Sequence, residues 1–156
     1  MTPEELMTRA VELSAHALRA RAGGPFGAVV AMAGEVVADG WNQVTSANDP
    51  TAHAEIVAIR EACRVLATFD LGGCELYASC EPCPMCLAAG YWARVDRIYY
   101  ANTRDDAAAI GFDDLRLNQE LVVGSRQRSL PMTRVEVPGA LDAFHAWSRS
   151  GDKTPY

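Results

Sequence analysis

Three evenly spaced cysteines in the stretch CEPCPMC have a spacing that could bind a metal or do redox chemistry. Cys80, Cys83 and Cys86 could begin an iron–sulfur binding run, supply half of a structural zinc site, or include a redox-active pair. A ferredoxin-type run needs a fourth cysteine at position 90, but Gly90 stands there and no cysteine follows Cys86. The sequence therefore does not favour an iron–sulfur cluster, and any further ligand must lie upstream.

The better partner for these cysteines lies in the stretch PTAHAEI. HAE at 53–55 followed by PCPMC at 82–86 has the pattern His-x-Glu and Pro-Cys-x-x-Cys, which is typical of zinc-dependent deaminases. Both halves are predicted to lie at helix N-termini, where free N–H groups and the helix dipole favour thiolates. Cys83 and Cys86 are three residues apart and share a helix face. His53, Cys83 and Cys86 are therefore the predicted ligands of one Zn²⁺ per chain, with a fourth position left for water.

Glu55 lies two residues after the predicted zinc ligand His53. A carboxylate in a first helical turn is commonly no more than a favourable charge there. Beside an open zinc site it can act as a general acid and base, moving a proton from the bound water to the substrate. We expect this catalytic role for Glu55. Cys80, which ends the strand before the helix that carries Cys86, is interpreted as a small buried residue.

The elements expected to position these residues alternate along the chain. A capping box at Thr2 and Glu5 begins a first helix, and two strands around Gly34 form a hairpin. The helix that carries Glu55 follows. Next come a strand (CELYAS), a helix (MCLAAGYWARV), a strand (RIYYAN), short helical pieces over 105–120, a strand (TRVEV) and a last helix (ALDAFHAWSRS). This order predicts one α/β domain over residues 1–156, with a three-layer α-β-α architecture around a central five-stranded mixed sheet.

The composition limits the partners. The chain has 156 residues, the size of one domain, and a formal net charge of −6. Because nucleic-acid binding relies on basic phosphate contacts, a nucleic-acid partner is not expected. No signal peptide or membrane-spanning stretch is visible, and five cysteines are an odd number for a disulfide framework. We therefore expect a cytoplasmic protein that acts on a small molecule and does not bind a membrane.

The chain also resembles the cytidine deaminase superfamily, and within it the bacterial guanine deaminases. The similarity runs nearly end to end and includes GGPFGAVV, GWNQVTSANDPTAHAE, SCEPCPMC, YWARV, GFDD, FHAW and the terminal tyrosine. The zinc motifs are specific for the superfamily, whereas GFDD and the terminal tyrosine favour guanine over other bases. The resemblance implies a cytidine deaminase-like fold and hydrolytic deamination of guanine to xanthine and ammonia. Glu55 would protonate the ring nitrogen and then the leaving amino group.

The resemblance also assigns residues to the substrate. Asp114 matches a second family carboxylate that recognises the 2-amino edge or helps to move protons, and Asp113 beside it competes for this role. Asn42 resembles the residue that hydrogen-bonds the purine. The substrate-binding candidates are Phe26, Asn42, Ala54, Trp92, Phe112, Asp113 and Tyr156. Structural alternatives are a loop cap for Asn42, core packing for Phe26, Trp92 and Phe112, and an acidic helix start for the two aspartates.

Tyr156 is a special case, because a terminal residue is normally frayed. By resemblance, a C-terminal segment of roughly residues 138–156 swaps between the subunits of a homodimer, and its tyrosine closes the partner's pocket. Pro155 stands where relatives often carry a charged residue, which leaves the path of the tail open.

Three other functions share parts of this pattern. A tRNA adenosine-34 deaminase has the same zinc chemistry and a PTAHAE element, but the net charge of −6 is a poor match for an RNA backbone. A guanosine or ammeline deaminase would differ in pocket depth, which the sequence does not show. A non-catalytic zinc-binding or redox protein would make Glu55 dispensable.

Overall fold

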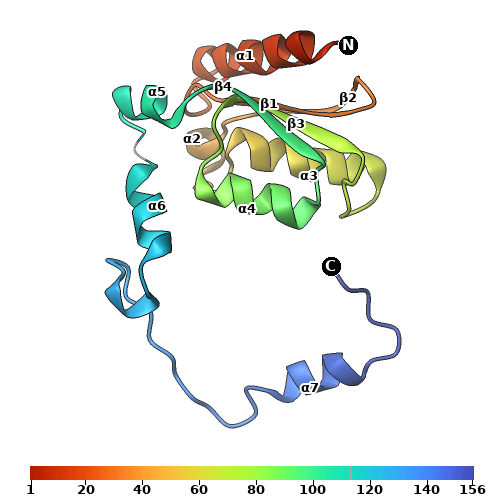
Figure 1. The fold of residues 1–156 in the computed structure, drawn as a ribbon, viewed down its shortest axis with the longest axis vertical. Coiled ribbons are helices and arrows are strands. Elements are labelled where there is room, and N and C mark those ends of the chain that lie inside the picture. The colour runs from red at the N-terminus through yellow and green to blue at the C-terminus, as the bar shows by residue number, and fades with distance from the viewer. Residues whose placement is uncertain (113) are drawn as a thin grey trace.

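A computed structural model describes residues 1–112 and 114–156 (Figure 1). Its central feature is a mixed sheet of four strands in the order β2-β1-β3-β4. β1 pairs antiparallel with both β2 and β3, whereas β3 pairs parallel with β4. The strands span Gly27–Met32 (β1), Glu35–Trp41 (β2), Cys74–Cys80 (β3) and Arg97–Asn102 (β4).

The β1–β2 hairpin confirms the predicted turn at Gly34. Ala33 and Gly34 both have positive φ, 50° and 80°, which suits the tight turns that join twisted antiparallel strands. A register shift between Val30 and Ala31 bends the pair. β1 is buried along nearly its whole length, so the sheet is covered on both faces.

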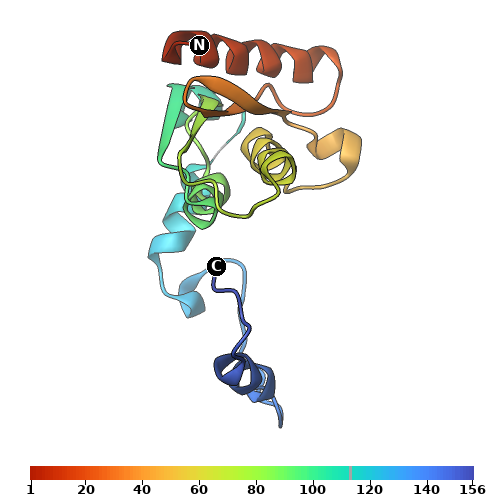
Figure 2. The ribbon, with the colours of Figure 1, turned by 90° about the vertical axis from the view of Figure 1, so that its right-hand side faces the viewer.

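Helices cover both faces of the sheet, as predicted (Figures 1 and 2). On one face α1 (Pro3–Arg19), which begins with the expected capping box, packs Leu6 and Ala10 against Val29 and Tyr77. The other face carries α3 (Ala54–Leu66) and α4 (Pro84–Ala93). The core on that side consists of Ala28, Val30, Ala38, Ala54, Ala58, Ile59, Ala62, Leu71, Cys74, Leu76 and Ala93. Of the helices in the described part of the chain, none combines the length and the apolar character that a membrane crossing would require.

The remaining elements are short. They are α2 (Val44–Ala47), α5 (Arg104–Ala109), α6 (Leu115–Val122), the 3-10 helix η1 (Ser125–Gln127) and α7 (Asp142–Arg149). α5 and α6 are the short helical pieces predicted over 105–120, and Gly111, with a φ of 94°, lies between them.

The prediction of a fifth strand over TRVEV is wrong. Residues 133–137 form no strand, and the sheet has four strands rather than five. All five residues are exposed, including Val135 and Val137. An alternating sequence becomes a strand only where a sheet edge lies beside it to take its hydrogen bonds, and within this chain the segment runs away from the sheet (Figure 1).

From α6 onward the chain forms an arm that leads away from the α/β body (Figures 1 and 2). We define the arm as residues 115–156. Its large apolar side chains are exposed, and they include Leu121, Val122, Leu130, Val135, Phe144, Trp147 and Tyr156. Single exposed apolar residues are ordinary, but such a concentration is typical of a surface that another protein surface covers.

Candidate active site

The three predicted metal ligands come together where α3 and α4 begin. His53 is the N-cap of α3, Cys83 is the N-cap of α4, and neither side chain caps its own helix. Cys86 lies in the first turn of α4, with Pro84 between the two cysteines at the first helical position. The imidazole and both sulfurs are therefore available to a shared centre, which confirms the predicted ligand cluster.

The spacing of the donor atoms fits a tetrahedral zinc ion. Nδ1 of His53 lies 3.6 Å from Sγ of Cys83 and 3.5 Å from Sγ of Cys86. A Zn–S bond of about 2.3 Å and a Zn–N bond of about 2.0 Å at a tetrahedral angle separate sulfur from nitrogen by about 3.5 Å. All three atoms lie within 4.8 Å of one another. Three protein ligands leave one position for a small molecule, as in catalytic rather than structural zinc sites.

The electrostatics of the ligand set also favour a divalent cation. The hydrogen bond from Cys86, reinforced by His53, lowers the pKa of the Cys83 thiol to about 4. The same pairing, together with burial, raises the pKa of Cys86. The hydrogen bond to Cys83 raises the pKa of His53. The Cys83 thiolate is therefore buried and accepts hydrogen bonds from the other two ligand side chains. Binding of Zn²⁺ would displace the protons in these hydrogen bonds and neutralise the negative charge of the thiolate.

Glu55 is a buried carboxyl group beside this ligand set. It lies in the first turn of α3, with 7% of its surface exposed, and it lines the pocket in front of the ligands. Burial disfavours the charged form and raises the pKa of Glu55. A carboxyl group with this environment suits the predicted role of accepting a proton and then donating it.

A pocket of about 300 Å³ opens onto Glu55, at the lower end of the range for small-molecule sites. It brings together the predicted residues Phe26, Asn42 and Asp114 with the metal ligands. The complete lining is Gly24, Phe26, Asn42, Val44, Thr45, Pro50, His53, Glu55, Cys80, Glu81, Cys83, Phe112 and Asp114.

Asn42 presents its amide nitrogen as the group available to a ligand. Its Oδ1 accepts hydrogen bonds from the backbone N–H groups of Gly24 and Val44, both at 3.2 Å. The residue is 4% exposed, so these bonds fix the orientation of the amide. A Cβ atom on Gly23 would lie 2.0 Å from Oδ1, which is why a glycine stands there. Asn42 is therefore a donor, suited to an acceptor atom of a purine.

Phe26 and Phe112 form one wall of the pocket. Their rings meet edge to face, with centroids 4.9 Å apart and an interplanar angle of 87°. A Cβ atom on Gly24 would lie 2.8 Å from Cζ of Phe112 and 2.9 Å from Cε2 of Phe26. The GG pair at 23–24 thus allows both the Asn42 contact and the aromatic wall, although α1 already ends at Arg19.

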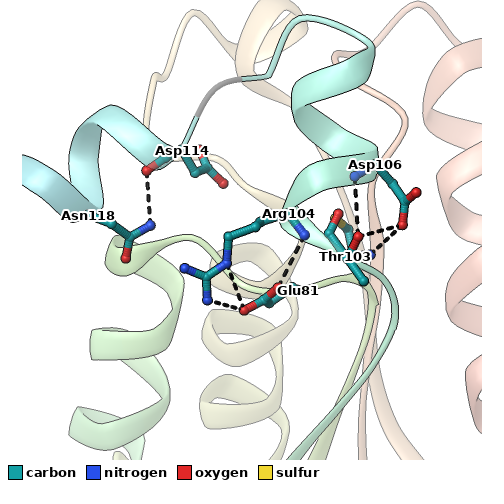
Figure 3. A network of polar contacts seen from close by, with 7 residues as sticks. Glu81, Thr103, Arg104, Asp106, Asp114 and Asn118 are labelled. Atoms are coloured by element: carbon teal, nitrogen blue, oxygen red, sulfur yellow. Dashed lines mark hydrogen bonds and ion pairs between the residues drawn. The ribbon is translucent and has the colours of Figure 1, made fainter.

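Cys80 and Glu81 line the pocket although the sequence did not predict them there. The Cys80 thiol donates to the backbone carbonyl of Thr103 at 3.4 Å and lies outside the metal cluster. Burial raises the pKa of Cys80 to about 11, so it stays protonated. Glu81 is bound by Arg104 (Figure 3). Both residues belong to the CEPCPMC motif, but the motif alone does not indicate that they line the pocket. Their position depends on the path of the chain after β3.

Three predicted substrate contacts, Trp92, Tyr156 and Ala54, do not line the pocket within this chain, and a fourth cannot be placed. Trp92 lies on α4 and is 67% exposed, and Tyr156 is 72% exposed. Their ring centroids are 6.1 Å apart. Ala54 is fully buried, with its carbonyl oxygen against Gly40. Asp113 lies outside the described residues. Roles for these four residues remain predictions.

Comparison with known proteins matches the site to one family. Residues 1–102 match the cytidine and deoxycytidylate deaminase zinc-binding region. Guanine deaminase of Bacillus subtilis is 46% identical over 156 residues, which is 100% of both chains. A solved structure of guanine deaminase from Bacillus subtilis has a TM-score of 0.96 and covers 100% of this chain and 99% of the other.

Two further relatives match a smaller part of the chain. A tRNA-specific adenosine deaminase of Haemophilus influenzae is 37% identical over 128 residues, covering 78% of this chain and 73% of its own. A solved chain in complex with 8-azaguanine is 40% identical with a TM-score of 0.69, and the match covers 72% of this chain and 65% of the other. The match to the Bacillus subtilis guanine deaminase therefore extends over the arm as well as the zinc region.

Proposed function

The chain belongs to the cytidine and deoxycytidylate deaminase family, and we propose that it is a hydrolase that deaminates guanine to xanthine and ammonia. One observation carries this proposal above the others. The sequence is 46% identical to a guanine deaminase over the full length of both chains, including the arm. The solved guanine deaminase structure matches this chain with a TM-score of 0.96. The match to the tRNA-specific adenosine deaminase covers 78% of this chain at lower identity.

Zn²⁺, when bound by His53, Cys83 and Cys86, supplies an activated water for the hydrolysis. Glu55 would transfer one proton from this water to the ring nitrogen, and a second proton, from the hydroxyl group added at C2, to the amino group that leaves as ammonia. Asn42 donates its amide N–H to an acceptor atom of the base, and the Phe26–Phe112 wall holds the flat ring. Asp114, which lines this pocket, would recognise the 2-amino edge or help to move protons.

A substrate panel tests the function. Purified zinc-loaded protein is incubated with guanine, guanosine, ammeline and an RNA anticodon stem–loop, and ammonia release gives kcat/KM for each. We expect guanine to have the highest value. A higher value for guanosine or ammeline would reassign the substrate, and ammonia from the RNA alone would make the chain a tRNA deaminase.

We further propose that two chains form a homodimer in which the segment of roughly residues 138–156 is exchanged. Three features support this. The apolar side chains of the arm are exposed, α4 also exposes Leu87, Tyr91 and Trp92, and Tyr156 does not reach the pocket of its own chain. An exchanged segment would cover both apolar surfaces and could bring Tyr156 to the partner's pocket.

We place the reaction in purine breakdown or salvage in the cytoplasm, with a free purine base as the small-molecule partner. The chemistry of the proposed substrate and product supports the pathway. All five cysteines are free thiols, three of them at the site, which suits a reducing compartment. Separate tests are fractionation of cells that express the chain, and guanine and xanthine levels after its removal.

A further inference from the structure

Glu81 and Arg104 join the metal-ligand loop to α5 (Figure 3). The backbone N–H of Arg104 donates to Oε2 of Glu81 at 3.1 Å, and Nε of Arg104 donates to Oε1 at 3.1 Å. The terminal nitrogen of the guanidinium also donates to Oε1. In addition, the backbone N–H of Glu81 donates to the carbonyl of Asn102 at 2.8 Å. Glu81, two residues before the ligand Cys83, is thus bound to the segment where β4 passes into α5.

α5 connects this contact to the wall of the pocket. Arg104 is the first residue of α5. At the other end, the N–H of Phe112 donates to the carbonyl of Ala107 at 3.0 Å, and Gly111 donates to Ala108 at 3.0 Å. Phe112 is therefore hydrogen-bonded to the helix that begins at Arg104, and its ring meets Phe26 across the pocket. A displacement of α5 would displace this ring.

α5 needs an anchor because it is short. It has six residues, far below the length of about 12–15 at which an isolated helix becomes marginally stable. Its capping box joins Thr103 to Asp106, which stabilises the first turn but does not attach the helix to the body. An exposed ion pair alone contributes little. The Glu81 side chain, however, is 19% exposed and accepts hydrogen bonds from three donors of Arg104.

We propose that Arg104 is a positioning residue that, through Glu81 and α5, holds Phe112 as the wall of the base pocket. The inference rests on the proposed function for its substrate. Zn²⁺, when bound, would hold the loop at Cys83 independently, so loss of Arg104 should loosen the wall that contacts the base more than the reacting centre. The expected signature is a rise in KM with a nearly unchanged kcat, because binding common to substrate and transition state is lost.

A double-mutant cycle with Phe112 tests this connection. Arg104→Gln should raise KM for guanine about tenfold, with kcat within about twofold of the wild type. Phe112→Ala should have a similar effect. The double variant should have a KM no higher than that of Phe112→Ala, because both substitutions remove the same interaction, the contact of the Phe112 ring with the base. Zinc content should stay at one per chain in every variant. Independent, multiplying effects, or an unchanged KM in Arg104→Gln, would overturn the inference.

Arg64→Gln is the matched control, since it removes an arginine paired with Glu61 on the surface of α3. It should leave KM unchanged. Hydrogen–deuterium exchange gives a readout that needs no substrate: amides of 107–112 should exchange faster in Arg104→Gln than in wild type or Arg64→Gln. If wild-type protein does not deaminate guanine but this difference is present, the proposed function fails and the anchor stands. Equal exchange in all three proteins overturns the anchor.

Discussion

Single residues divide the pocket into a reacting side and a binding side. His53, Cys83 and Glu55 line one part of it, at the starts of α3 and α4. Asn42 and Phe26 flank the β1–β2 hairpin, and the backbone N–H of Asn42 donates to the backbone carbonyl of Phe26 at 3.0 Å. The sheet holds the binding side in place and the helix starts hold the reacting side, so substitutions on the two sides should have different kinetic effects.

Glu55→Gln should separate zinc binding from catalysis. The amide keeps the size of the side chain but cannot accept and return the proton, so kcat should fall by about 10²–10⁴-fold. Metal analysis should still find one zinc per chain, because Glu55 is not one of the three ligands. Wild-type turnover in this variant would instead support a non-catalytic zinc protein.

Removal of zinc should abolish turnover and lower the melting temperature together. A ligand bound only to the folded chain stabilises it, and the open zinc position is where the hydrolytic water binds. Dialysis against a chelator, followed by activity and thermal unfolding measurements, checks this. One equivalent of Zn²⁺ should restore both properties. Activity that survives in protein shown to be metal-free would contradict the zinc site as the catalytic centre.

At the scale of elements, the close contact of β2 with α3 sets the position of His53 and Glu55. The backbone of α3 approaches β2 at Gly40, where an added Cβ atom would lie 2.3 Å from the carbonyl oxygen of Ala54 and 2.6 Å from the nitrogen of Ala58. These are backbone atoms, so a side chain could be accommodated only if the whole helix moved. Gly40 thus allows α3 to place its N-terminus at the pocket.

Gly40→Ala should therefore reduce both stability and activity. Forcing a methyl group into a packed core costs about 1–3 kcal/mol, and for a chain of this size each kcal/mol lowers the melting temperature by about 2–4 °C. Thermal unfolding and kcat/KM for guanine measure the two effects. Gly124→Ala is the control, because it lies outside the segment proposed to be exchanged and the nearest atom to its added Cβ atom is Oε1 of Gln127 at an ordinary 3.7 Å; it should change neither quantity. Equal melting temperatures for the two variants would show that the close approach is not limiting.

At the scale of the whole molecule, the main feature is the arm, whose exposed apolar side chains have no covering surface within one chain. Leu130, Phe144 and Trp147 are 76%, 72% and 49% exposed, which is unusual for a folded chain without a partner. Trp92 and Tyr156 lie beside each other but outside the pocket. Exchange of the proposed segment of roughly residues 138–156 would bury Phe144, Trp147 and Tyr156, and it would make activity a property of the dimer.

A mixed dimer tests the exchange. Deletion of Tyr156 should lower kcat/KM about tenfold, on the scale of one aromatic contact. A differently tagged Glu55→Gln chain is then co-expressed with the Tyr156-deleted chain, and the heterodimer is purified. If Tyr156 closes the partner's pocket, one site has both Glu55 and Tyr156, and the heterodimer should reach about half the wild-type activity. If each tail serves its own chain, the heterodimer should be no more active than half the deleted homodimer.

The sequence alone determined the metal-ligand set and most of the body, and it predicted Glu55 as the catalytic carboxylate. These features depend on short-range signals: the PCPMC spacing places Cys83 and Cys86 on one turn, and the capping box of Thr2 and Glu5 begins α1 wherever the helix packs. The alternation of helices and strands up to β4 was likewise visible, because each element has its own periodicity.

Only the tertiary structure decided which distant segments meet. The TRVEV segment has the pattern of a strand, but strand formation depends on a neighbouring edge, and this chain offers none beside residues 133–137. The contact of Arg104 with Glu81 and that of Phe112 with Phe26 join residues 23 and 86 positions apart in the chain. Periodicity describes one element at a time, whereas these contacts depend on how the packed elements are placed relative to one another.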